Sequence, residues 1–190
     1  MLQALLAFVL PVLVLFAGFA LQKKVKGPSG LTLAGLEEKL RGVTDGGDHF
    51  KAHMLHKRIW GYNLKEVDAF MQKMEGDGRE LYIKLLWWDL LFPLFYGLAL
   101  IWGLYQGREL MDQPFHVIWC WLPLISMIAD WTENGLLLHQ FLHYEEGQIQ
   151  SLNAISIGVA GLATMLKMIS IVVFFIFLAW LTLPKLATTV

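Results

Sequence analysis

Five polar residues lie within otherwise apolar stretches of this sequence, and they are the residues best suited to chemistry. They are three acids, one base and one amide: Asp89, Asp130, Glu133, Asn134 and Lys167. Asp130, Glu133 and Asn134 occupy positions i, i+3 and i+4, so a helix presents them on one face. An ionisable side chain at the centre of a membrane helix costs about 2.5 to 3.5 kcal/mol on insertion scales and usually faces the bundle interior. Three acids against one base leave two negative charges without a partner.

Three interpretations of these five residues, the polar cluster, stay open. Lys167 can tie neighbouring helices together as a structural clamp. Alternatively, the cluster forms a proton or cation pathway, or a pocket for a cationic small molecule. A proton, a bound cation or amine, water, or a partner's basic residue then balances the excess charge. Catalysis is the third interpretation, but the spacing assigns no nucleophile and base pair.

Residues close to the polar cluster constrain its surroundings. Pro93 lies four residues after Asp89, and its missing N–H leaves the carbonyl of residue 89 without its helical donor. Gly97 follows, so we expect a kink just beyond the acid, which either lines a cavity or only shapes helix packing. Tyr96 and Trp131 lie deep in the apolar stretches, where each needs a polar partner.

Histidines at helical spacing suggest a different chemistry. His49, His53 and His56 are spaced i, i+4 and i+7, and His139 and His143 are spaced i, i+4. Imidazole suits zinc and non-haem iron. The spacing loosely resembles the HxxxH boxes of membrane fatty-acid desaturases and hydroxylases, which would imply a metal enzyme on the inner face. The chain lacks that family's HxxHH boxes and its length, so we predict no cofactor.

Four apolar stretches are long enough to hold the polar cluster within a bilayer. A transmembrane helix needs about 20 mostly apolar residues to cross about 30 Å of hydrocarbon. The stretches cover residues 1–21, 85–105, 115–138 and 154–183. In these spans the ionisable residues lie about 6 to 12 Å from the inner end. Residues 151–166 either join the last span or lie at the interface, and we expect one long continuous helix.

Basic residues determine the expected orientation. All but three of the 15 Lys and Arg residues fall within residues 22–84, the exceptions being Arg108, Lys167 and Lys185. The positive-inside rule therefore places residues 22–84 inside and both termini outside, in a bacterial inner membrane or an organellar membrane. The first span has no basic n-region and is followed by Gln22 and two lysines, which favours a retained helix over a cleaved signal peptide.

The inside segment, residues 22–84, also carries helical signals. Thr32 and Asp48 are expected to cap two short helices. Asn63 followed by Glu66 is a capping-box pattern ahead of an apolar stripe. The stripe consists of Leu64, Val67, Phe70, Met71 and Met74. Such an amphipathic helix lies on the membrane or packs under the bundle.

Part of the chain resembles a pattern found in small uncharacterised multi-pass membrane proteins of four helices. The resemblance covers about the middle half of the chain, and its elements are individually unspecific. They are Gly61, Tyr62, Gly78, Arg79, Tyr82, Asp89, Pro93, Tyr96, Asp130, Glu133 and Asn134. The resemblance implies an architecture and no activity.

Composition limits the remaining classes of protein. With 56% hydrophobic residues and a net charge of −1, the chain is neither disordered nor a basic protein that coats nucleic acid. Cys120 is a single cysteine, which excludes an internal disulfide. Walker, dinucleotide-binding, GxSxG and HExxH motifs are missing from the sequence, and so are strand signals.

We therefore expect an all-α integral membrane protein that forms one domain over residues 1–190. Four transmembrane helices form its bundle, and a small helical segment connects the first two on the inside. The expected function is non-enzymatic, that of a structural or accessory subunit. Its expected partners are the lipid bilayer and another membrane protein or a second copy of the chain.

Overall fold

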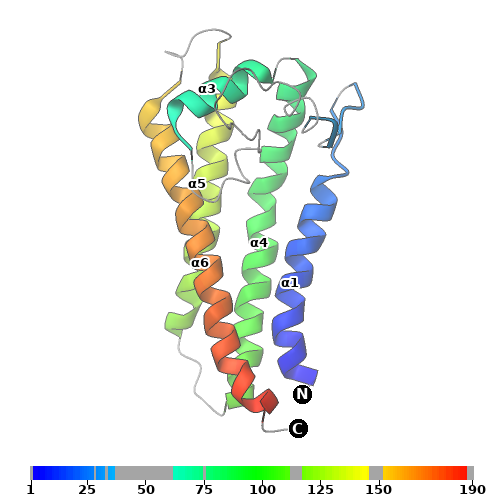
Figure 1. Ribbon diagram of the computed structural model, residues 1–190, viewed down its shortest axis with the longest axis vertical. Helices are drawn as coiled ribbons and strands as arrows, with labels where there is room; N and C mark the ends of the chain where they lie inside the picture. The colour runs from blue at the N-terminus through cyan, green and yellow to red at the C-terminus, as the bar shows by residue number, and fades with distance from the viewer. Residues whose placement is uncertain are drawn as a thin grey trace, which may run out of the picture.

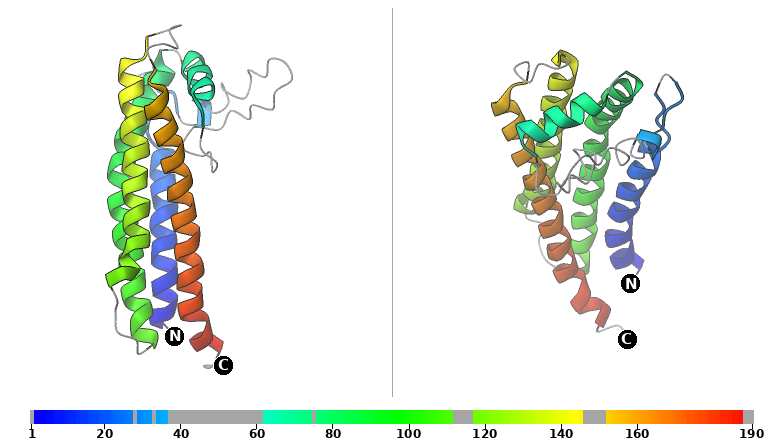
Figure 2. Two further views of the ribbon diagram at one scale, coloured as in Figure 1. Left: turned by 90° about the vertical axis from the view of Figure 1, so that its left-hand side faces the viewer. Right: turned by 45° about the horizontal axis from the view of Figure 1, so that its top comes forward.

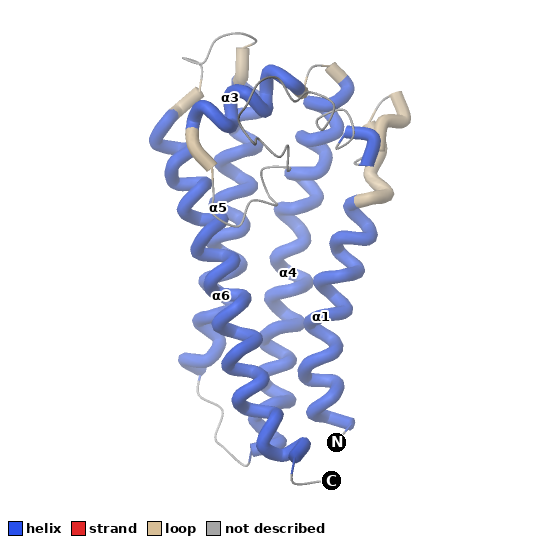
Figure 3. Tube along the Cα trace, in the orientation of Figure 1, coloured by secondary structure: helices blue, strands red, loops and turns tan. Residues whose placement is uncertain are grey.

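A computed structural model describes residues 2–27, 29–32, 34–36, 62–74, 76–111, 117–145 and 152–187. Within these residues the chain is helical and contains no strand, so the predicted all-α class is confirmed (Figure 3). Four long helices run side by side (Figure 1). They are α1 (Leu2–Gln22), α4 (Asp77–Met111), α5 (Trp121–His143) and α6 (Ala154–Ala187).

Two of these helices are long and apolar enough to cross a membrane. The qualifying parts are Asp77–Gln106 of α4 and Ala154–Trp180 of α6. In α1 the apolar part, Val9–Gln22, is too short for a span by the same criterion of length and hydropathy. α5 does not meet this criterion either. The expected continuous last helix is present, because α6 runs without a break from Ala154. Within the described residues, length and composition thus identify two candidate spans, fewer than the four expected.

Both ends of the chain lie at one end of the bundle, and a short helix crosses the opposite end (Figures 1 and 2). This helix, α3 (Leu64–Lys73), precedes α4 in the chain. A 3-10 turn, Val117–Cys120, leads into α5. α5 packs against α4 and α6, whereas α1 packs chiefly against α4.

The start of α3 has the predicted capping box. The Asn63 side chain accepts a hydrogen bond from the backbone N–H of Glu66 at 3.1 Å, and the Glu66 carboxylate accepts one from the Asn63 N–H at 2.8 Å. These contacts satisfy N–H groups that the first turn of a helix leaves free. The apolar stripe of α3 is buried in a core with α4, α5 and α6, so α3 packs against the end of the bundle.

Side chains from distant parts of the sequence join the helices at this end. Arg79 donates hydrogen bonds to the carbonyl oxygens of Phe141 and Tyr144, at 2.7 and 2.9 Å, and so caps the end of α5. The Tyr144 hydroxyl donates to Asp68 of α3 at 3.1 Å. These bonds hold α3, α4 and α5 in a defined arrangement.

Only part of the remaining inside segment can be compared with its prediction. The Thr32 hydroxyl accepts a hydrogen bond from the N–H of Gly35 at 3.3 Å, and residues 34–36 are helical, in agreement with the predicted cap. The second predicted helix, with its cap Asp48, lies outside the described residues. So do His49, His53, His56 and His116.

Gly161 of α6 brings the chain just before α3 into close contact with the bundle. A Cβ atom at this position would lie 2.7 Å from the backbone carbonyl oxygen of Tyr62. Backbone atoms cannot move aside as a flexible side chain can. Only glycine therefore permits this approach.

We predict that Gly161→Ala destabilises the fold by about 1 to 3 kcal/mol, the usual cost of an overpacked contact. Gly158→Ala is the matched control on the same helix, because its Cβ would meet no atom within 4 Å. The measurement is the free energy of unfolding in mixed detergent micelles. Equal stabilities of the two variants would contradict the close approach of Tyr62 to α6.

Candidate functional site

The five residues of the polar cluster are all buried and lie together between the helices. At its centre the Lys167 ammonium donates to Asp130 Oδ1 at 3.0 Å and to Glu133 Oε2 at 2.5 Å. Lys167 belongs to α6 and both acids belong to α5. One cation thus bridges two carboxylates on a neighbouring helix.

The Asp130 carboxylate accepts further hydrogen bonds from α4 and α5. The Tyr96 hydroxyl donates to Asp130 Oδ2 at 3.0 Å, and Asn134 Nδ2 donates to Oδ1 at 2.9 Å. With Lys167, three donors on three helices therefore surround this carboxylate. Tyr96 thereby has the polar partner that its depth in the apolar stretch requires.

The backbone carbonyls near Pro93 accept hydrogen bonds from α5. Asn134 Nδ2 lies 3.2 Å from the Asp89 carbonyl oxygen, the acceptor that Pro93 deprives of its helical donor. Trp131 Nε1 donates to the next carbonyl, that of Leu90, at 2.8 Å. α4 continues as one helix through Pro93 and Gly97, and the kink expected there stays a prediction.

The fourth helix joins the cluster through a residue that the sequence does not single out. The Gln22 side chain, at the end of α1, donates a hydrogen bond to the Asp89 carboxylate. From sequence Gln22 only marks the end of an apolar stretch. In the structure the Gln22 side chain is buried, and its second role is to bind Asp89.

Next to the cluster is a small cavity of about 90 Å³. Its apolar lining comes from α1, α4 and α6. Six polar residues complete the lining: Gln22, Asp89, Tyr96, Asp130, Asn134 and Lys167. The cavity therefore exposes two carboxylates within the bundle.

Glu133 lies on a different side of the cluster and does not line the cavity. It is fully buried, and among the described residues its Oε1 atom has no hydrogen-bond partner. The Tyr62 phenol is close to Glu133 and Thr164. Burial raises the pKa of Tyr62 well above its ordinary value, and the negative charge of Glu133 raises it further. Tyr62 therefore stays neutral and closes this side of the cluster. The sequence links neither Tyr62 nor Thr164 to Glu133.

The two histidines that the structure describes, His139 and His143, contact each other at the end of α5. The rings of His139 and His143 are stacked with centroids 4.4 Å apart, and His143 Nδ1 lies 2.8 Å from the His139 carbonyl oxygen. Within the described residues no group of three or more His, Cys, Asp or Glu side chains is placed to hold a metal ion. The metal site proposed from the histidine spacing therefore stays a prediction, since His49, His53 and His56 lie outside the described residues.

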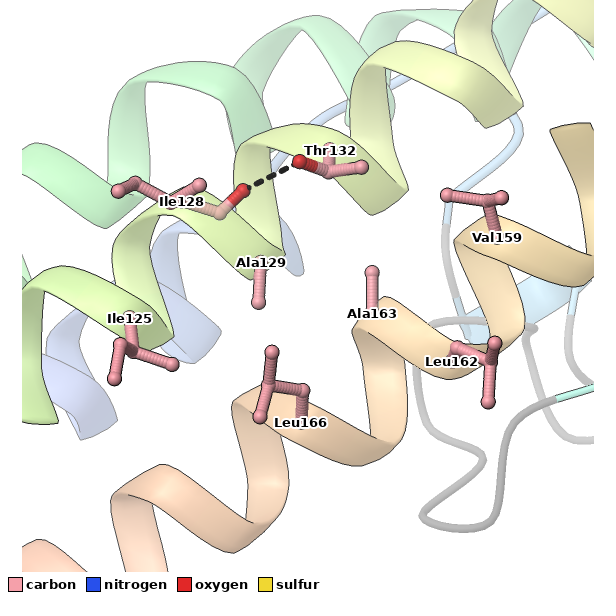
Figure 4. A pocket seen from close by; sticks show the side chains of 8 residues that line it. All are labelled: Ile125, Ile128, Ala129, Thr132, Val159, Leu162, Ala163 and Leu166. Atoms are coloured by element: carbon pink, nitrogen blue, oxygen red, sulfur yellow. Dashed lines mark hydrogen bonds between the residues drawn. The ribbon is translucent and has the colours of Figure 1, made fainter.

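A larger groove of about 350 Å³ lies between α5 and α6 (Figure 4). Its one polar side chain, Thr132, donates its hydroxyl to the Ile128 carbonyl at 2.8 Å. The other lining residues are apolar: Ile125, Ile128, Ala129, Val159, Leu162, Ala163 and Leu166. The groove thus offers no ionisable side chain to act as a general acid or base.

Comparisons with known proteins give no further information on the site. No family model, curated protein or solved structure matches the chain. The function must therefore be inferred from the geometry of the site and the surface of the bundle.

We predict that Lys167→Met lowers the free energy of unfolding by about 3 to 5 kcal/mol, because it leaves buried acids without their cation. Lys84→Met is the control, since it removes an exposed lysine and should change stability by less than about 0.5 kcal/mol. Both values come from unfolding in detergent micelles.

Replacing the acidic partners of Lys167 as well separates the effect of unpaired charge on stability from the effect of altered packing. Adding Asp130→Asn and Glu133→Gln to Lys167→Met should recover part of the lost stability, since the unpaired carboxylates are then gone. A triple variant less stable than Lys167→Met alone would contradict this account of the ion pairs.

Proposed function

We propose that this chain is an integral membrane protein of four spanning helices that serves as a non-enzymatic structural or accessory subunit. The observation that carries the proposal is a polar centre with closed ion pairs, to which all four long helices contribute, inside an apolar exterior. α1 contributes Gln22, α4 contributes Asp89, α5 contributes Asp130 and α6 contributes Lys167. Such a centre joins the helices and leaves their outer faces free for lipid or partners.

The exposed faces of the four helices support an apolar environment. Phe16 on α1 is 68% exposed, Leu98 on α4 62%, Ile128 on α5 56% and Ile176 on α6 65%. Large apolar patches on a protein surface mark contact with a membrane or another protein. The groove in Figure 4 continues this apolar surface between α5 and α6.

Helix length permits all four helices to span. At 1.5 Å per residue, the 21 residues of α1 and the 23 of α5 extend about 32 and 35 Å. The hydrocarbon core of a bilayer is about 30 Å thick. α5 carries two acids, but Lys167 is paired with both, which offsets part of their insertion cost.

The arrangement of the bundle also agrees with the proposed orientation. Both termini lie at the end opposite α3 (Figure 2). The exposed lysines Lys23, Lys24 and Lys26 directly follow α1. Basic residues favour the cytoplasmic side or its equivalent, so we place α3 inside and the termini outside.

A carrier of a proton or cation is the second candidate, and the cavity beside Asp89 favours it. A water molecule occupies about 30 Å³ in the liquid, so a cavity of about 90 Å³ has room for about three. We rank the carrier second because Lys167 is held by two acids in a closed arrangement.

We predict opposite membrane sides for α3 and the C-terminus. In a Cys120→Ser background, the cysteine of the Lys65→Cys variant should react with a membrane-impermeant maleimide only in inside-out vesicles. A tag at the C-terminus should be cut by added protease only in right-side-out vesicles. Resistance of the protein to alkaline extraction is the accompanying measurement. Labelling and cleavage in the same vesicles would contradict four spans.

The accessory role predicts a stable complex at native abundance. Purification in a mild detergent should yield the chain in a stoichiometric assembly with another membrane protein or a second copy, with a mass above that of one chain. Light scattering with correction for bound detergent measures this mass. A stable monomer without a partner would contradict the accessory role while leaving the topology unaffected.

A further inference from the structure

The cavity beside the polar cluster has more negative than positive formal charge. It is lined by the carboxyl groups of Asp89 and Asp130 and by the ammonium group of Lys167, its one basic side chain. That ammonium group is already bound to Asp130 and Glu133. No positive charge of the described lining is therefore directed at Asp89.

One buried oxygen acceptor on a residue of the cavity lining has no donor among the described residues. Asn134 is 1% exposed, and its Oδ1 atom has no hydrogen-bond partner among the described residues. Its orientation is determined by Nδ2, which donates to the Asp89 carbonyl and to Asp130. Asp89 Oδ1 accepts a hydrogen bond from Gln22. A buried acceptor without a donor or cation costs about 1 to 3 kcal/mol.

The donor set identifies the class of ligand. Carboxylate and amide oxygens suit hard cations such as Na⁺, Mg²⁺ and Ca²⁺. Divalent ions prefer several carboxylates, whereas two line this cavity, and the described residues hold no group of three metal-ligating side chains. A cavity of about 90 Å³ accommodates one small ion with one or two waters.

We propose that this cavity binds one small monovalent metal cation, of the Na⁺ class, between Asp89, Asp130 and Asn134. The ion lies next to Asp89, because the Lys167 ammonium is already bound to Asp130 and Glu133. It supplies the positive charge that the cluster lacks and a partner for Asn134 Oδ1. This inference goes beyond the proposed structural role, which needs no bound ion, and it deepens the second candidate by naming the class of cation.

The test uses the purified full-length protein in detergent micelles at pH 8 in choline chloride. Replacing choline with Na⁺ at constant ionic strength should raise the melting temperature in a saturable way. Isothermal titration with NaCl should give one ion per chain. An unchanged melting temperature together with no binding heat would overturn the proposal.

Two variants locate the effect. Asp89→Asn should abolish the Na⁺-dependent shift, because it removes the carboxylate charge next to the ion. Asp77→Asn, the same substitution at an exposed position of α4, should retain the full shift. A shift that persists in Asp89→Asn, or is lost in Asp77→Asn, would place the ion elsewhere and overturn the proposal.

If the Asp89→Asn variant does not fold, the Asn134→Leu variant provides a second test of the cation site. It removes the unpartnered amide oxygen and keeps both carboxylates, so Na⁺ affinity should fall at least tenfold in the same titration. An unchanged affinity would reject the assigned ligands.

Discussion

The ion pairs of Lys167 with Asp130 and Glu133 are the constraint on which the rest of the structure depends. Two carboxylates and one ammonium are held in an apolar bundle at 3.0 and 2.5 Å. The attraction is strong in such surroundings, but so is the cost of removing these charges from water. The arrangement is therefore stable only while α5 and α6 keep the rotation that brings the three groups together.

The other helices follow from this pairing because their polar groups need partners at the same level. Tyr96 of α4 donates to Asp130, and Asn134 of α5 donates to the carbonyl that Pro93 leaves free. Gln22 connects α1 to Asp89. Each bond satisfies a group that would be costly to bury alone, so together they select one register of the four helices.

Within the described residues, the four long helices bury a polar centre and expose large apolar side chains such as Phe16, Leu98 and Ile176. The polar side chains of this centre form hydrogen bonds and ion pairs mainly with one another. Among the described residues, no nucleophile lies beside a base. Bonds at the α3 end, such as those from Arg79 to α5, close the bundle on that side. This distribution supports the proposed structural or accessory role, and the small cavity at Asp89 is the place where we propose a bound cation.

The sequence by itself determined what depends on neighbours three or four residues apart. The helical class, the capping box at Asn63, the shared face of Asp130 and Asn134, and the carbonyl freed by Pro93 all follow from such spacing. Only the tertiary structure decided that Lys167 pairs with both acids of α5, that Gln22 reaches Asp89 and that Tyr62 packs on Gly161. These contacts join residues 34 to 99 positions apart. They depend on helix rotation and register, which the packing of the whole bundle sets and local periodicity does not encode.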